Sequence, residues 1–163
     1  MGTIAVDDCS VFMDDVPEDF RISRGHIEWC AKAMGAILAG MHWLGCLDGR
    51  GFEFALAPAN VDHPSEFETD FGKLILWMLD FEQIGRINPL GLNGMEEAAT
   101  VFYEEIPSCP DPDTSPYLWS QFKSRNTERV RGLAGRDFIE RVRKKSNRTG
   151  CLLLNPPKPA GTY

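Results

Sequence analysis

An uninterrupted apolar run that ends on two carboxylates constrains this chain more than any other feature. The six residues LILWML occupy positions 74–79, and Asp80 and Glu82 follow at once. A run of this length predicts a strand, and its composition predicts burial along the strand body. A carboxylate beside buried apolar residues has to be solvated, paired or bound to a cation. We therefore expect Asp80 and Glu82 at a strand end, where they form part of a candidate site.

A second acidic segment precedes this strand. Asp48 stands in the glycine-rich stretch LDGRG, and Glu53 follows five residues later. Residues 52–57 predict another strand, and the polar residues 59–70 predict the loop between the two strands. Strands joined in this way most simply pair antiparallel. Asp48 is then either a site acid or a residue that only stabilises a tight turn, and the sequence leaves both open.

Helical periodicity explains the segment before these strands. After Ser23, which can cap a helix, apolar residues recur at spacings of three and four: Ile27, Cys30, Met34, Ile37, Leu38, Met41 and Leu44. We expect this helix to be buried along one face. Its alanine and glycine positions allow another element to approach closely.

Three more helices are expected after the strands. Asn93 and Glu96 resemble a capping box for a helix that ends near Glu105, and Pro116 is suited to a first helical position. The helix from Pro116 directs Leu118, Trp119 and Phe122 inward, and a basic helix over 137–145 has Phe138, Ile139 and Val142 on its apolar side. The predicted class is α+β, mostly helical, with a small β-hairpin carrying the acidic site.

Length and composition limit the organisation of the chain. With 163 residues, 43% of them hydrophobic, the sequence predicts one domain with a real core. We expect a flexible acidic segment over 1–22, a single domain over 23–154 and a proline-rich tail over 155–163. No apolar stretch reaches bilayer length and the start is acidic, so neither a membrane helix nor a secretory signal is expected. The cytoplasm is the expected compartment, and the sequence leaves the oligomeric state open.

The five cysteines predict no metal site. They stand far apart, and the chain contains no Cys-x-x-Cys or His-x-x-x-His pair. We expect reduced and mostly buried thiols, no structural zinc and no cofactor.

Charge is distributed unevenly along the chain. The net charge is −7, but residues 1–122 carry 6 Lys/Arg against 21 Asp/Glu, a balance of −15, whereas residues 123–148 carry 10 against 3, a balance of +7. One interpretation is that the basic segment binds nucleic-acid phosphates. The other is that it docks on, or balances, the acidic body. The candidate phosphate ligands are Lys123, Arg125, Arg129, Arg131, Arg136, Arg141, Arg143, Lys144, Lys145 and Arg148.

The order of the acidic residues resembles that of protein kinases. In kinases a catalytic-loop Asp, an Asn five residues later and a strand-terminal Asp-Phe-Gly converge on nucleotide and metal. The corresponding order in this chain is Asp48, Glu53 and then Asp80-Phe81-Glu82. A glycine-rich phosphate loop and a strand lysine are missing before Asp48, and Glu82 places a charge where kinases have glycine. The resemblance therefore implies a kinase-like half without phosphoryl transfer.

A wider resemblance carries a second implication. The strings MHWLGCLDGRGFEFAL, LWMLDFEQI, GMEEAATVF, EIPSCPDP and YLWSQF resemble the C-terminal half of a large fungal family labelled as a zinc-finger-like domain of unknown function. The resemblance covers roughly residues 26–131. The family that these strings resemble includes arginine-containing cyclodipeptide synthases, which use aminoacyl-tRNA in secondary metabolism and carry an Asp-Asp-x-x-Glu motif.

Asp14, Asp15 and Glu18 form the one match to that motif in this chain. The resemblance implies a catalytic set of Asp14, Asp15, Glu18, Asp48, Glu53, Asp80 and Glu82, with arginyl-tRNA and a second aminoacyl-tRNA as partners. A guanidinium substrate needs carboxylates, and tRNA needs a basic surface. Three functions remain open: a tRNA-dependent cyclodipeptide synthase, a non-catalytic kinase-like interaction module or shortened family member, and a small-molecule phosphotransferase.

Overall fold

The computed structural model describes residues 22–60, 67–69, 72–91, 93–106, 109–129 and 133–154. Over these residues the predicted α+β class is confirmed. The elements are α2 (Arg24–Gly40), the π-helical turn η2 (Met41–Gly45), β1 (Glu53–Pro58), β2 (Glu68–Thr69), β3 (Gly72–Leu79), α3 (Gly94–Glu105), α4 (Pro116–Arg129) and α5 (Leu133–Leu154). The expected flexible segment and the proline-rich tail lie outside the described residues, apart from Ile22.

Helix α2 begins where the sequence predicts. The Ser23 hydroxyl accepts the backbone N–H of His26 at 3.2 Å, and Cys30, Met34 and Leu38 are buried on one face. At Met41 the helix widens into η2, so the expected register does not continue. Leu44 is consequently 76% exposed, and its predicted place on the buried face is wrong.

The predicted antiparallel hairpin is confirmed. β1 pairs with β3 so that Glu53 lies opposite Leu79 and Pro58 opposite Leu74. The expected loop over 59–70 is wrong in part, because Glu68 and Thr69 form β2 and give the sheet order β1-β3-β2. A strand of two residues is too short to leave a periodic pattern in the sequence.

Burial of β3 is only partial along most of the strand. Leu74, Leu76 and Met78 alternate along the strand and pack with residues of α2 such as Cys30 and Met34. Only Leu74 is fully buried, and Leu79 is 41% exposed. The expectation of burial along the whole strand body is therefore wrong, because residues 75–78 are only half-buried.

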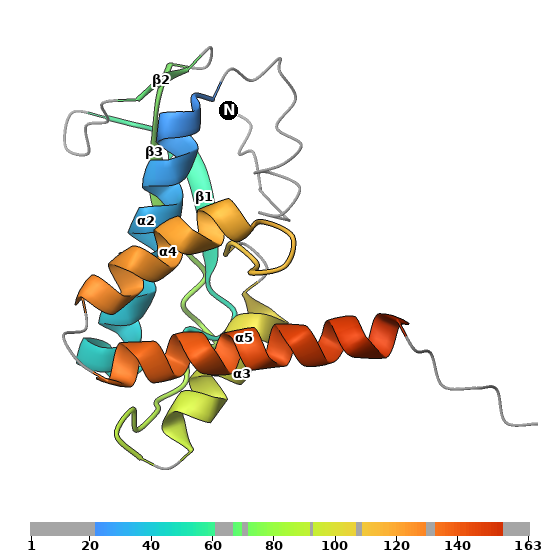
Figure 1. Ribbon diagram of the computed structural model, residues 1–163. Helices are drawn as coiled ribbons and strands as arrows, with labels where there is room; N and C mark the ends of the chain where they lie inside the picture. The colour runs from blue at the N-terminus through green and yellow to red at the C-terminus, as the bar shows by residue number, and fades with distance from the viewer. Residues whose placement is uncertain are drawn as a thin grey trace, which may run out of the picture.

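The helices pack around a core of aromatic side chains. Phe102 of α3 contacts Phe122 of α4 and Phe138 of α5, with ring centroids 5.5 and 5.6 Å apart. Figure 1 shows α4 crossing α2, with β1 and β3 behind α2, and α5 running across α3. The expected close approach occurs at Gly35 of α2, where a Cβ atom would overlap the carbonyl oxygen of Phe122. The predicted inward residues of α4 and α5 are all buried: Leu118, Trp119, Phe122, Phe138, Ile139 and Val142.

The start of α3 differs from the expected capping box. The Asn93 side chain forms no cap hydrogen bond, although α3 runs from Gly94 to Glu105 as predicted. Glu96 turns to α5 instead, where it pairs with Arg141 and Lys145 at 2.9 Å each. Two cations compete successfully with one backbone N–H for this carboxylate. None of the described helices is long and apolar enough to cross a bilayer.

Candidate functional site

The loop that carries Asp48 is shaped by the π-helical turn before it. Cys46 follows η2 and caps its C-terminal end in a left-handed backbone conformation with φ 53°. The N–H groups of Cys46 and Leu47 both donate to the Met41 carbonyl. The chain then reverses and runs beside the segment after β3. Cys46 accepts the N–H of Ile87 at 2.9 Å, and Asp48 donates its N–H to Gly85 at 3.0 Å. These bonds hold the two loops together.

The carboxylate of Asp48 closes this contact. It is almost fully buried, at 2% exposure, and its Oδ1 accepts the N–H of Arg50 at 3.0 Å and of Gly85 at 2.8 Å. Its Oδ2 lies 3.5 Å from Nε of Arg50. A Cβ atom at Gly85 would lie 2.6 Å from Oδ2, so the absence of a side chain at this position makes room for the carboxylate. The Asp48 carboxylate therefore accepts hydrogen bonds from two main-chain N–H groups and lies beside the Arg50 guanidinium.

Arg50 extends the network to α3. Its Nη1 donates to Oε1 of Glu105 at 2.6 Å, and the Arg50 side chain is 40% exposed. The guanidinium thus joins the buried Asp48 to the end of α3. The bond from the Asp48 carboxylate to the N–H two residues on is a common turn feature, and it agrees with the predicted alternative that Asp48 stabilises a tight turn. No sequence signal connects Arg50 with Glu105, because the two residues are far apart in the chain.

His42 supports the same loop from the core side. Its Nε2 lies 3.3 Å from the Asp48 carbonyl oxygen, and its ring packs against Phe138 with centroids 4.8 Å apart. Nδ1 is buried and has no hydrogen-bond partner. Burial lowers the pKa of His42 from 6.5 to about 4, although the carbonyl opposes the shift. The ring is therefore neutral at pH 7, with Nε2 assigned as the donor to the carbonyl.

The other predicted acids of the hairpin lie in solvent. Glu53, Asp80 and Glu82 are exposed, and none of them forms an ion pair with a described residue. Glu53 and Asp80 share one end of the hairpin, because Glu53 pairs with Leu79 in the ladder. The expectation that Asp80 closes a buried strand is wrong. Asp80 and its neighbour Phe81 are exposed, the latter to 52%, so water solvates the Asp80 carboxylate. The Asp80 backbone has a left-handed conformation with φ 64°.

The structure does not bring the whole predicted catalytic set together. Asp48 is buried in a hydrogen-bonded loop, whereas Glu53, Asp80 and Glu82 are exposed. Asp14, Asp15 and Glu18 lie outside the described residues. The described part of the chain contains no group of three His, Cys, Asp or Glu side chains arranged to hold a metal ion.

The basic segment divides into paired and unpaired cations. Arg141 pairs with Glu96 and Asp137, Lys145 with Glu96, and Arg125 with Glu128. Glu96 has a lowered pKa, first because of the hydrogen bond from Lys145 and then because of that from Arg141. These contacts support the interpretation that part of the basic segment docks on the acidic body.

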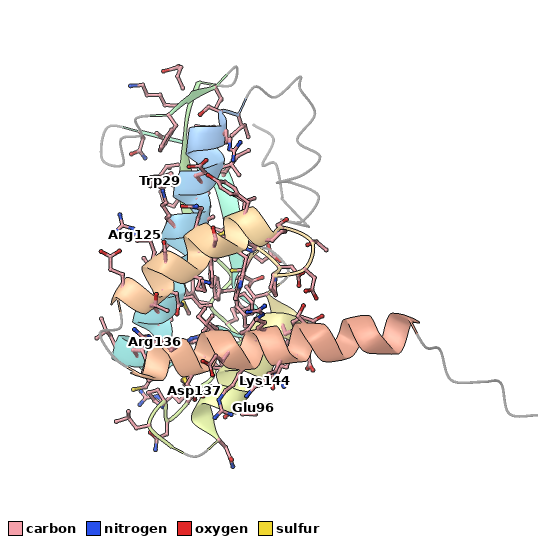
Figure 2. The ribbon with its side chains drawn as sticks, in the orientation of Figure 1. Trp29, Glu96, Arg125, Arg136, Asp137 and Lys144 are labelled. Atoms are coloured by element: carbon pink, nitrogen blue, oxygen red, sulfur yellow. The ribbon has the colours of Figure 1, made fainter. Side chains whose placement is uncertain are left out.

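Four cations of this segment stay exposed, without an ion pair to any described residue: Lys123, Arg136, Arg143 and Lys144. Figure 2 shows Arg136 near the start of α5 and Lys144 farther along the same helix, with Glu96 of α3 beside α5. Glu140 is also exposed on α5, so the exposed charges of the helix include both signs. The side chains of Arg129, Arg131 and Arg148 are not among those described.

The described cysteines offer no reactive pair. Cys30 and Cys46 are free thiols, and Cys30 and Cys109 are buried. Burial raises the pKa of the Cys30 thiol to about 12, so this group stays protonated and inert.

Comparison with known proteins adds no relative, since no family model, no curated protein and no solved structure matches this chain.

Proposed function

We propose that this chain is a non-catalytic interaction module with the architecture of the C-terminal half of a protein kinase, acting in the cytoplasm. The observation that carries the proposal is the environment of Asp48. A catalytic-loop acid has to face its substrate and accept a proton from it. Asp48 instead is buried and accepts from the N–H groups of Arg50 and Gly85.

The order of elements supports the kinase-like part of the proposal. A helix, a loop with Asp48, an antiparallel hairpin and an Asp-Phe pair at residues 80–81 follow one another as in the kinase C-terminal half. The described residues contain no counterpart of the glycine-rich loop and strand lysine that bind nucleotide in kinases. Glu82 stands in place of the kinase glycine, and its exposed carboxylate repels phosphate.

A nucleotide-binding experiment tests this proposal. A ligand that binds only the native state raises the melting temperature by mass action. Because the proposed module does not bind nucleotide, millimolar ATP with magnesium is expected to leave the melting temperature of the chain unchanged. The exposed-acid variant Glu82→Gly restores the kinase residue and serves as the matched control. An ATP-dependent rise in melting temperature for the parent chain, lost on Asp80→Asn, would overturn the proposal and favour the phosphotransferase.

A second candidate is an arginine-using, tRNA-dependent cyclodipeptide synthase. The observation that favours it is the set of exposed, unpaired charges of both signs. Glu53, Asp80 and Glu82 are free to pair with a guanidinium, and Arg143 and Lys144 are free to contact phosphate.

The chemistry of this candidate needs two esters and a base. Each amide bond forms when an α-amine attacks the carbonyl that joins an aminoacyl group to tRNA, and the tRNA leaves with a free hydroxyl. A carboxylate takes the proton of the attacking amine. Asp14, Asp15 and Glu18 are proposed for this role and for holding the arginine side chain.

Expression in a heterologous host, followed by mass spectrometry for arginine-containing cyclic dipeptides, tests the second candidate. The host supplies charged tRNA, so product is expected without added substrate. Asp14→Asn, Asp15→Asn and Glu18→Gln should each abolish product, whereas Glu97→Gln, an exposed acid on α3, should not. The synthase assignment fails if the parent chain yields no cyclic dipeptide.

Binding of tRNA is tested separately. The double variant Arg143→Ser, Lys144→Ser should flatten the dependence of affinity on salt, since each neutralised phosphate releases counterions. The matched double variant Lys73→Ser, Arg86→Ser removes two exposed cations elsewhere and should keep the slope of the parent. Equal slopes for both double variants would remove α5 as the tRNA contact.

A further inference from the structure

One edge of β3 carries main-chain groups that no described residue of the chain pairs. β1 covers one edge from Leu74 to Leu79, whereas β2 covers the other edge only at Gly72 and Lys73. Phe67 adds one contact there, accepting the N–H of Leu74 at 3.4 Å. The edge from Ile75 onward has no neighbouring strand among the described residues.

The ladder fixes which groups point to this free edge. Lys73 accepts the N–H of Ala59 on the β1 side at 2.8 Å, and the N–H and C=O of one strand residue point to the same edge. Alternate residues point to opposite edges, so Leu76 and Met78 direct their N–H and C=O groups away from β1. Neither residue forms a hydrogen bond on that side.

The usual protections of a sheet edge are missing here. Edge strands are normally kept apart by charged side chains, prolines or bulges. Residues 74–79 contain no charge and no proline, and the β1–β3 register continues without a bulge. An uncharged, apolar edge of this kind accepts an added strand.

We propose that the free edge of β3 pairs with β3 of a second copy of this chain, antiparallel and about a twofold axis. Leu76 then lies opposite Met78 of the second copy, and each pair exchanges N–H and C=O groups. The axis cannot be centred nearer to Leu74, because Phe67 already occupies the position opposite that residue. The two hairpins join as one sheet in the order β1-β3-β3-β1.

The choice of a second copy follows from symmetry and charge. A twofold axis places the N–H groups of one copy opposite the C=O groups of the other, and the reverse. The same edge is therefore complementary to itself, and no further sequence feature is needed for the pairing. The chain has a net charge of −7, but residues 74–79 of the edge carry no charge, so the proposed pairing places no like charges directly opposite each other. Pairing through β3 needs no catalytic site, and it extends the proposed interaction module without depending on how Asp48 or α5 act.

The mass of the full chain in solution, measured over a dilution series, tests the pairing together with amide hydrogen exchange. A dimer is expected at high concentration, with the amides of Leu76 and Met78 protected in the dimer and exchanging rapidly after dilution to the monomer. A chain that stays monomeric throughout overturns the proposal. Protection of the two amides in the monomer also overturns it, because the chain's own residues would then cover the edge.

Two lysine substitutions provide a matched pair. Leu79 lies at the end of the edge, 41% exposed, and Leu79→Lys should weaken dimerisation about tenfold or more by placing a charge opposite Ile75 of the second copy. Leu90→Lys, at an 87% exposed site in a different loop, should leave dimerisation unchanged. Met78→Pro removes an edge N–H and should also prevent pairing, with the melting temperature reporting on the fold. Equal dimerisation of both lysine variants would place the contact elsewhere and refute pairing through β3.

Discussion

Protonation of His42 should destabilise the chain in mild acid. Burial lowers the pKa of His42 in the folded chain from 6.5 to about 4. Between pH 6.5 and pH 4, His42 is therefore protonated in the unfolded chain but neutral in the folded chain. The contribution of His42 to stability is therefore fully present above pH 6.5. It falls as the pH decreases and is lost completely below pH 4.

The size of the effect follows from the two pKa values. Linkage gives a loss of about 2 kcal/mol in the free energy of unfolding between pH 7.5 and pH 5, and roughly 3 kcal/mol below pH 4. His26, whose pKa is also lowered by burial, contributes with the same sign. The effect of His42 is therefore measured as the difference between the parent chain and a His42 variant in how much the free energy of unfolding changes with pH, and not from the total change in the parent.

Urea unfolding at pH 7.5 and pH 5 of the parent chain and of His42→Gln isolates this term. Glutamine keeps a donor for the Asp48 carbonyl oxygen but does not titrate, so the variant should lose about 2 kcal/mol less than the parent on acidification. The absolute stability of the variant is not the readout, since replacing a buried side chain carries its own cost. Equal losses in the two proteins would refute a lowered pKa at His42.

Three further predictions concern the loop, the α2–α4 contact and the α3–α5 contact. Asp48→Ala should lower the free energy of unfolding by roughly 3 kcal/mol in urea unfolding, because two buried N–H groups lose their acceptor, whereas the exposed Asp80→Asn should change it by less than about 0.5 kcal/mol. Gly35→Ala should destabilise by about 1 to 3 kcal/mol through overlap with the main chain of α4, and Gly40→Ala, where the space is open, should not lower the melting temperature. Glu96→Gln should cost at most about 1 kcal/mol in low salt, and the loss should vanish at high ionic strength, because the carboxylate is half exposed.

The sequence predicted those elements whose signals are local. α2, α4 and α5 follow from apolar spacing, and the β1–β3 hairpin follows from two apolar runs with a polar loop between them. The Ser23 cap is also a local signal and is present as predicted.

What the sequence did not reveal depends on contacts between distant residues. The bond from Gly85 to Asp48 and the pair of Arg50 with Glu105 exist only once the loops and α3 have packed together. The π-helical turn shifts Leu44 off the buried face, because one added residue per turn rotates every side chain after it. Asp80 resembled a buried strand end because an apolar run does not show how much of a strand its neighbours cover.

The hydrogen bond between Gly85 and Asp48 bears on both the proposed non-catalytic module and the proposed pairing through β3. Asp48 precedes β1 and Gly85 follows β3, so their hydrogen bonds close the open end of the hairpin from outside the ladder. The Asp48 carboxylate thereby joins the loop before β1 to the segment after β3 within the chain itself, without any partner. A strand that is already ordered loses less conformational entropy on pairing than a flexible one. Asp48→Ala should therefore weaken pairing through β3 as well as stability, and unchanged dimerisation of a folded Asp48→Ala variant would separate the two roles.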